Sequence, residues 1–194
     1  MRKLVVVAFM SLDGVVQAPG DPQEDTEGGF AHGGWQRPYF DDIFLQQAAG
    51  GMAETDAQLF GRKTYDKMAA FWPTVGDDDP FAKHLNHVRK YVASRSKTEA
   101  GWENTTVLNG DVVAQVRDIK AQPGRTISML GSSDLAQTLM AHDLIDEYSL
   151  AVHPVVLGSG KKLFRDNQQL RKLELVDSTS TTTGVLLNTY RPAR

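Results

Sequence analysis

The sequence contains no cysteine, and this absence excludes disulfide bridges, thiolate zinc sites and a cysteine nucleophile. No segment approaches the roughly 20 consecutive apolar residues of a membrane-spanning helix, so we expect no contact with a membrane. The first apolar run, residues 4–10, is too short for the core of a secretory signal, and a polar turn follows it at once. We therefore expect a cytoplasmic protein.

The chain also lacks a large excess of either positive or negative charge. The 194 residues carry a formal net charge of −3, and no block of like charge exceeds three residues. A general nucleic-acid binder needs a basic face, so we do not expect that class. Hydrophobic residues make up 41% of the chain, which is enough to bury a core. The length suits one domain, and we interpret residues 1–194 as a single domain.

Strand and helix patterns alternate up to about residue 145. Residues 3–10 form a β-branched run without alternation, which is typical of a strand buried on both faces of a sheet. From residue 170 onward, two stretches predict an antiparallel pair of strands around a turn at Thr183 and Gly184. The pattern predicts an α/β fold with a mainly parallel central sheet, an antiparallel C-terminal edge and helices on both faces.

Glycine and proline set the expected boundaries of other elements. Residues 38–50 predict a helix that stops at Gly50 and Gly51, and residues 147–160 predict a long strand interrupted at Pro154. Residues 17–38 are rich in Gly, Pro, Asp, Glu and Gln and show no periodicity. A connection of this length in a compact domain is usually a functional lid or a mobile insert.

Three strand ends carry residues that suit a bound anion. They are Gly61-Arg62-Lys63-Thr64, Ser94-Arg95-Ser96 and Gly131-Ser132-Ser133. Ligands of open α/β sheets bind at the carboxyl ends of strands, and a helix start offers free amides and a positive dipole. Each segment alone is better explained as a turn or a helix cap. Together they predict a ligand with more than one phosphate, although no G-x-G-x-x-G segment follows the first strand.

Several motifs resemble a known family when they are taken in order. They are "VVVAFMSLDG" (5–14), "FGRKTY" (60–65), "ASRS" (93–96), "MLGSSDLAQTL" (129–139) and "IDEYSLAVHPVVLGSGKKLF" (145–164). This order and spacing resembles the dihydrofolate reductase-like family, in particular the proteins related to the C-terminal reductase domain of the bifunctional riboflavin biosynthesis protein. The resemblance covers residues 3–191 and implies a dihydrofolate reductase-like fold.

The resemblance also implies NADPH as cofactor. In similar proteins the Gly-Arg-x-Thr segment and the glycine-rich helix start hold the pyrophosphate, and the Ser/Arg turn meets the 2′-phosphate. Carried over, the cofactor-binding residues are Gly61, Arg62, Thr64, Ser94, Arg95, Gly131, Ser132 and Ser133. The chemistry agrees, because an NAD site needs an acid for the ribose diol and "SRS" carries none.

The substrate end of the site is expected at the end of the first strand, in the long loop and at the helix after Pro38. Candidate catalytic acids are Asp13 and Asp41, and candidate substrate contacts are Trp35, Tyr39, Trp72 and Lys161. Five of these have an ordinary alternative: Asp13 as a turn residue, Asp41 as an acid that complements a helix dipole, both tryptophans as packing residues and Lys161 as a hairpin-turn charge. His84 and His87 lack a partner ligand, so we expect no metal site.

The leading hypothesis is an NADPH-dependent reductase that transfers a hydride to a small heterocyclic or ribosylaminouracil-phosphate-like substrate of riboflavin biosynthesis. One alternative is a dihydrofolate reductase. It is weakened because Phe40 stands where the Trp-x-x-Pro spacing of those enzymes places a buried acid. A second alternative is a nucleotide-binding module without turnover. We also expect a homodimer, because a long antiparallel edge needs cover and riboflavin-type reductases are dimeric.

Overall fold

The computed structural model describes residues 1–166 and 169–193. Its strands are β1 (Lys3–Ser11), β2 (Thr55–Gly61), β3 (Arg89–Ala93), β4 (Thr105–Leu108), β5 (Thr126–Leu130), β6 (Glu147–His153), β7 (Leu173–Ser180) and β8 (Leu186–Pro192). Its helices are α1 (Asp42–Glu54), α2 (Arg62–Phe71), α3 (Pro80–His87), α4 (Val112–Ala121) and α5 (Ser133–Ala141), with short 3-10 helices η1 (Glu27–Gly29), η2 (Arg37–Tyr39) and η3 (Trp72–Thr74).

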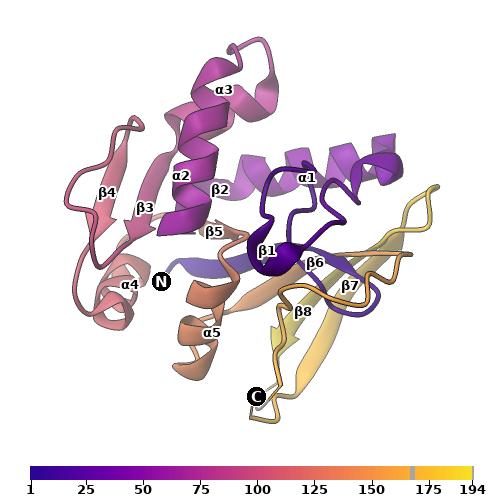
Figure 1. Cartoon of the computed structure of the whole chain (residues 1–194). Helices are drawn as coiled ribbons and strands as arrows, with labels where there is room; N and C mark the ends of the chain where they lie inside the picture. The colour runs from indigo at the N-terminus through magenta and orange to yellow at the C-terminus, as the bar shows by residue number, and fades with distance from the viewer. Residues whose placement is uncertain (167–168, 194) are drawn as a thin grey trace.

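All eight strands form one sheet in the order β4-β3-β2-β5-β1-β6-β8-β7 (Figure 1). The first six are parallel to their neighbours, whereas β8 is antiparallel to both β6 and β7. The predicted α/β class, the mainly parallel sheet and the antiparallel C-terminal edge are confirmed.

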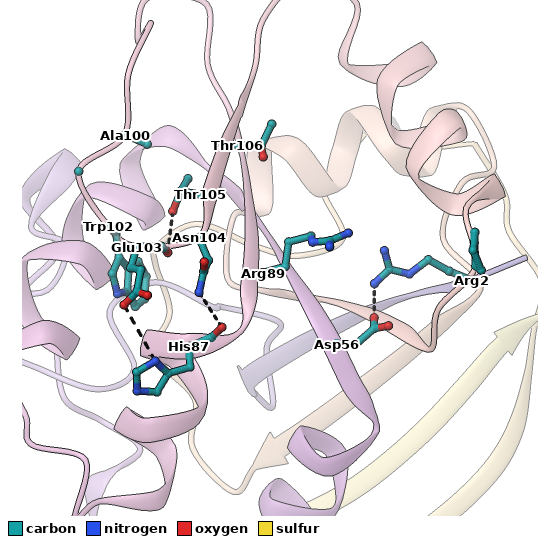
Figure 2. Close-up of a pocket in the computed structure, with 12 residues that line it drawn as sticks. Arg2, Asp56, His87, Arg89, Ala100, Trp102, Glu103, Asn104, Thr105 and Thr106 are labelled. Carbon is teal, nitrogen blue, oxygen red and sulfur yellow. Dashed lines mark hydrogen bonds and ion pairs between the residues drawn. The ribbon is translucent and has the colours of Figure 1, made fainter.

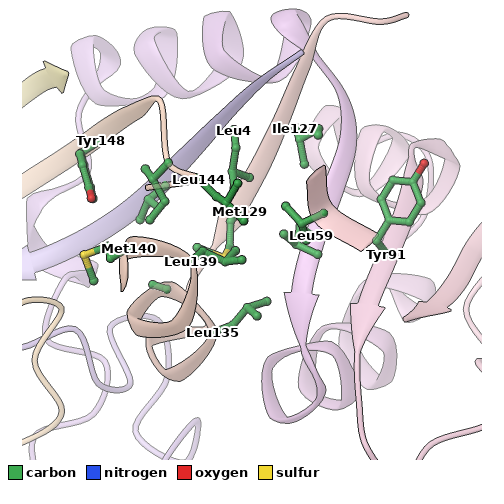
Figure 3. Close-up of a cluster of buried hydrophobic side chains, with 14 of the residues drawn as sticks. Leu4, Leu59, Tyr91, Ile127, Met129, Leu135, Leu139, Met140, Leu144 and Tyr148 are labelled. Carbon is green, nitrogen blue, oxygen red and sulfur yellow. The ribbon is translucent and has the colours of Figure 1, made fainter. Parts of the chain in front are cut away.

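The two faces of the sheet are covered by different helices. Strand residues alternate between them: Leu59 of β2 packs in the core cluster under α4 and α5, while its neighbour Phe60 packs with Tyr65 of α2 and Leu85 of α3. Figure 3 shows the first cluster, in which Leu139 of α5 lies against the central strands. Helix α1 covers the second face near β6 and β8, where its Phe44 packs in a further cluster. The prediction of helices on both faces is therefore confirmed.

The segment from residue 17 to residue 38, hereafter the strap, has a small core of its own. Phe30 and Trp35 are buried together with Val15 and Ala18. The Trp35 indole donates to the carbonyl oxygen of Gln17 at 2.8 Å. The Gln17 amide in turn donates to two carbonyl oxygens further along the strap, at 3.1 and 2.9 Å. Side-chain bonds to backbone thus hold a segment that has only short 3-10 turns as secondary structure.

Two predicted boundaries are wrong. Helix α1 does not stop at Gly50 and Gly51 but runs through both to Glu54. An interior glycine costs about 1 kcal/mol relative to alanine, and here the tertiary contacts of α1 offset that cost. The last strand before the tail ends at His153 and does not continue past Pro154, since proline has no amide for the ladder.

The C-terminal edge of the sheet is open to solvent. Strand β7 is exposed along most of its length, and Leu175 and Val176 are 56% and 46% exposed. Leu186 of β8 is also exposed. A long edge strand with apolar side chains is normally covered by another chain or element. Among the described residues, no helix combines the length and apolarity needed to cross a membrane.

We expect the chain to form a dimer through this edge. Light scattering at micromolar concentration should give twice the mass of one chain. Replacement of Val176 by Asp should shift the mass to that of a monomer, because a charge would be buried without a partner. The control is Val156→Asp. Val156 is 66% exposed and lies outside any strand, so this change should leave the mass unchanged. A single-chain mass for the unmodified protein would refute the dimer.

Candidate active site

The carboxyl ends of the parallel strands lie along one edge of the sheet. Because β3, β2, β5 and β1 are consecutive neighbours, this edge collects Ser94, Gly61, Gly131 and Asp13, each of which ends or follows one of these strands. Open α/β sheets bind their ligands at this edge. The three segments that the sequence indicates for phosphate are therefore brought to one side of the molecule.

Two of these segments contact each other directly. The backbone amide of Gly61 donates to Oγ of Ser132 at 2.9 Å, and the amide of Ser132 donates to Oγ1 of Thr64 at 3.2 Å. Gly131 and Ser132 both have left-handed backbone angles, with φ values of 66° and 58°. A Cβ on Gly131 would lie 3.3 Å from Cγ2 of Thr64. Glycine is needed here both for the backbone angle and for the close approach of the two segments.

The helices that start at this edge differ from the others in their caps. Helices α1, α3 and α4 each begin with an aspartate whose side chain accepts from amides of the first turn, namely Asp41, Asp79 and Asp111. Helix α2 begins after Gly61 and α5 after Ser132, and neither has a side-chain cap. Their first amides are thus left for solvent or a ligand. Two uncapped helix starts in contact form a suitable cradle for a pyrophosphate.

The first turn of α2 also carries cations. Arg62 and Lys63 occupy its first two positions, where the helix dipole disfavours positive charge. Arg62 pairs with Asp66 at 3.0 Å, and Lys63 pairs with Glu27 of the strap at 2.7 Å. Cations at the positive end of a helix are unfavourable until an anion binds there.

The turn after β3 is built by Ser94. Its Oγ accepts from the amides of Ser96 and Lys97, at 3.3 and 2.9 Å, so this hydroxyl serves the turn itself. Arg95 is exposed and makes no hydrogen bond or ion pair with any residue that the structure describes. Its guanidinium is free to meet a phosphate.

Asp13 is held by three donors. The hydroxyl of Ser11 donates to Oδ1 at 2.6 Å, and the amides of Leu157 and Gly158 donate at 3.1 and 2.8 Å. The Ser11 hydroxyl is the largest cause of a lowered pKa, burial opposes it, and the two amides lower the pKa further, to about 2. Asp13 is therefore ionised at neutral pH. Its catalytic role stays a prediction, and its contacts favour the alternative, a structural role.

Asp41 is also fully engaged. It accepts from the amide of Phe44 at 2.9 Å as the cap of α1, and from the amide and hydroxyl of Thr182 at 2.7 and 2.6 Å. The Thr182 hydroxyl is the main cause of its lowered pKa. Phe40, the residue at the expected acid position, is 43% exposed and stacks edge-on against Phe44. A catalytic role for Asp41 stays a prediction, and its contacts join α1 to the β7–β8 turn.

A buried histidine at the end of β6, His153, lies among aromatic side chains from several segments. His153 is 1% exposed, and burial is the main cause of its lowered pKa. Its ring lies edge-on to Trp35 at 5.1 Å and to Tyr39 at 5.5 Å, with Phe9 and Phe44 further out. It thus joins the strap, α1 and β1. The sequence indicated its position only by placing His153 at the end of a strand, which proves to be the neighbour of β1 and Asp13.

The remaining candidates divide into two groups. Lys161 donates to Asp25 and Glu27 of the strap at 2.7 and 2.6 Å, so it belongs to this edge. Ser133 opens α5 beside Arg165, at 3.4 Å. Trp72 lies apart: it follows the ten residues of α2, about 15 Å along the helix axis from Gly61. Its indole donates to the sulfur of Met68 at 3.0 Å, which favours the packing alternative.

A large cavity lies elsewhere, away from this edge. A cavity of about 860 Å³ lies near the amino ends of β2 and β3, and Figure 2 shows Arg2, Asp56, Arg89 and the 100–106 loop around it. None of the candidate residues lines it. We place the site at the carboxyl edge nevertheless, because the uncapped helices and free arginine lie there.

The model of the RibD C-terminal domain matches residues 2–187. The chain belongs to the RibD C-terminal domain family. One relative is the uncharacterized protein YyaP of Bacillus subtilis, which is 33% identical to this chain over 97% of this chain and 94% of that protein. The resemblance stated from the sequence is confirmed.

Solved structures support the fold of this RibD C-terminal domain protein. A putative riboflavin biosynthesis protein from Shewanella sp. PV-4 has a TM-score of 0.74 at 22% identity, covering 99% of both chains. The dihydrofolate reductase of Enterococcus faecalis, complexed with NADP(H), has a TM-score of 0.63 at 14% identity, covering 99% of this chain and 97% of that one. The predicted dihydrofolate reductase-like fold is confirmed.

The role of Asp13 can be tested by Asp13→Asn. An amide cannot accept from all three donors, and we expect the free energy of unfolding in urea at neutral pH to fall by about 1 kcal/mol, a value reduced for partial exposure. The folded pKa of about 2 lies below the ordinary 3.8, so the contribution is present above pH 3.8 and lost as pH falls towards 2. The gap between the two proteins should narrow over that range.

Asp21→Asn serves as the control, because Asp21 pairs with Arg37 on the exposed outside of the strap and should change stability little. If Asp13→Asn is as stable as the unmodified protein at neutral pH but loses catalytic rate, Asp13 acts in catalysis and not as a fastener of residues 157 and 158.

Proposed function

We propose that this protein is an NADPH-dependent reductase of a small heterocyclic substrate, with a ribosylaminouracil phosphate as the nearest chemical type. Membership of the RibD C-terminal domain family supports a reductase. The observation that carries the proposal is the contact between two uncapped helix starts, α2 and α5, through Gly61, Thr64 and Ser132. Such a pair of starts suits the two phosphates of a dinucleotide.

The charges beside this cradle fit NADPH in particular. Arg95 has no partner among the described residues and follows Ser94 at the end of the neighbouring strand β3. A free guanidinium suits a 2′-phosphate, whereas an NAD site needs an acid for the ribose diol. The Enterococcus dihydrofolate reductase, which shares the fold, is complexed with NADP(H).

When bound, the cofactor supplies a hydride, and the chain binds and orients both reactants. The substrate would lie beyond the cradle, against the strap and the aromatic side chains around His153. Asp13 and Asp41 are both ionised and held by amide and hydroxyl donors. We therefore propose that the proton for the product comes from water and not from either acid.

A dihydrofolate reductase remains the alternative enzyme. The similarity of the fold to that of a dihydrofolate reductase supports it. However, Phe40 is exposed, and Asp41 already accepts hydrogen bonds from Phe44 and Thr182, so neither is a buried free acid next to α1. A nucleotide-binding module without turnover is separated from both by oxidation of NADPH in the presence of candidate substrates. Absence of oxidation with normal NADPH binding would favour the module.

Cofactor choice tests the role of Arg95. NADPH should bind more tightly than NADH by about 1–3 kcal/mol, the range for hydrogen bonds to charged groups. Arg95→Ala should remove most of this preference and leave NADH binding nearly intact in calorimetric titrations. Arg89→Ala, which removes an arginine at the opposite edge of the sheet, should retain it. Equal affinities for the two dinucleotides would contradict the 2′-phosphate assignment.

The cradle itself is tested by Gly131→Val. A side chain at φ 66° is strained and would press on Thr64, so NADPH should bind at least about tenfold more weakly, a loss of about 1.4 kcal/mol. Gly110→Val is the matched control, since Gly110 has φ 85° but no atom within 4 Å of its added Cβ. It should lose a similar amount of stability and keep NADPH affinity. Equal NADPH affinity in both variants would make Gly131 only a turn residue.

A further inference from the structure

Three lysines converge on two carboxylates of the strap. Nζ of Lys161 lies 2.7 Å from Oδ2 of Asp25 and 2.6 Å from Oε2 of Glu27. Nζ of Lys63 lies 2.7 Å from the same oxygen of Glu27, and Nζ of Lys67 lies 3.8 Å from Oδ2 of Asp25. The lysines come from α2 and from the loop before residue 163, which are far apart in the sequence.

The grouping of the lysines is unfavourable without a shared anion. Like charges this close repel each other, and Lys63 adds its charge to the positive end of α2. The carboxylate of Glu27 relieves this by accepting from two ammonium groups through one oxygen. Hydrogen bonds from Lys161 and then Lys63 lower the pKa of Glu27 to about 2. A phosphate oxygen would meet the same donors with more charge.

The backbone of the strap does not depend on the Glu27 carboxylate, and Asp25 serves it through Oδ1, which accepts from the amide of Glu27 at 3.1 Å. The amide of Gln17 donates to the main-chain carbonyls of Asp25 and Glu27, and the indole of Trp35 donates to Gln17. The side chain of Glu27 is 54% exposed. The Glu27 carboxylate and Oδ2 of Asp25 can therefore leave the lysines while the backbone of the strap stays in place.

We propose that Lys63, Lys67 and Lys161 form a subsite for a phosphate group of a bound ligand, and that Asp25 and Glu27 occupy it until that ligand binds. The subsite adjoins the start of α2, so the phosphate belongs either to the dinucleotide or to a phosphorylated substrate. The subsite itself does not depend on the proposed function; only the identity of the ligand that carries the phosphate does.

The test measures binding of inorganic phosphate, ribose 5-phosphate and NADPH to the full chain by calorimetry at low salt. Glu27→Gln removes the competing charge and should tighten phosphate binding roughly three- to tenfold. Lys161→Gln removes a ligand-binding charge and should weaken it by about tenfold. The control is Asp21→Asn, which removes a strap carboxylate that pairs with Arg37 instead, and it should change binding by less than about twofold.

Lys161→Gln and Glu27→Gln together distinguish a phosphate subsite from ion pairs that only hold the strap in place. If the ion pairs only fasten it, Lys161→Gln frees the strap as Glu27→Gln does, and both should bind phosphate more tightly; this result would overturn the proposal. Unchanged or weaker phosphate binding by Glu27→Gln would also overturn it. In the double variant Glu27→Gln/Lys161→Gln, the gain should be lost.

The three probes identify the source of the phosphate. A gain for ribose 5-phosphate without one for NADPH assigns the subsite to the substrate, and the reverse assigns it to the dinucleotide; both support the subsite. If no variant binds or oxidises NADPH, the proposed function fails. A tighter response of Glu27→Gln to inorganic phosphate would still uphold the subsite, so the two failures are distinguishable.

Discussion

Strand β5 pairs in parallel with β2 on one side and β1 on the other, and this register places the two uncapped helix starts side by side. Gln58 lies opposite Ser128, so Gly61 and Gly131, each three residues further on, end level with each other. Val5 is also opposite Ser128, so β1 continues beyond β5 and pairs with β6 up to Ser11 and His153. The two helix starts therefore lie beside a wall formed by β1 and β6. A slip of one residue would separate Gly61 from Ser132 and turn the core side chains outward.

Electrostatics then distinguishes this edge from the rest of the surface. Helices α1, α3 and α4 have an aspartate N-cap at the positive end of the dipole. Helices α2 and α5 have no side-chain cap, and the first turn of α2 carries two cations. Each of these choices lowers the stability of the ligand-free chain by a modest amount. Natural chains break local rules of this kind mostly at functional sites. The strap lessens the imbalance, because its carboxylates supply negative charge to Lys63 and Lys161.

Local patterns predicted the strands, since β-branched runs buried on both faces leave an unambiguous signal. They also predicted the phosphate-type segments, because glycine and hydroxyl residues directly follow strand ends. The end of α1 was missed, since packing overrides the low helix propensity of Gly50 and Gly51. The ion pairs of Lys161 with Asp25 join residues 136 positions apart, and the cage around His153 joins four segments. No periodicity or spacing in one sequence reports such contacts.

The two acids that the sequence offers for catalysis are both engaged in structural hydrogen bonds. Asp13 fixes residues 157 and 158, which precede Lys161, and Asp41 fixes the β7–β8 turn against α1. Both carboxylates thus hold backbone segments at the edge where we propose that the substrate binds. In the proposed reductase the hydride comes from the cofactor, so the chain need only orient the reactants and limit water. On this proposal, residues 157–163 and the strap determine which substrate fits, while the helix starts of α2 and α5 bind the cofactor. Differences in substrate among proteins of this fold are expected in the former, and not in the sheet that positions both.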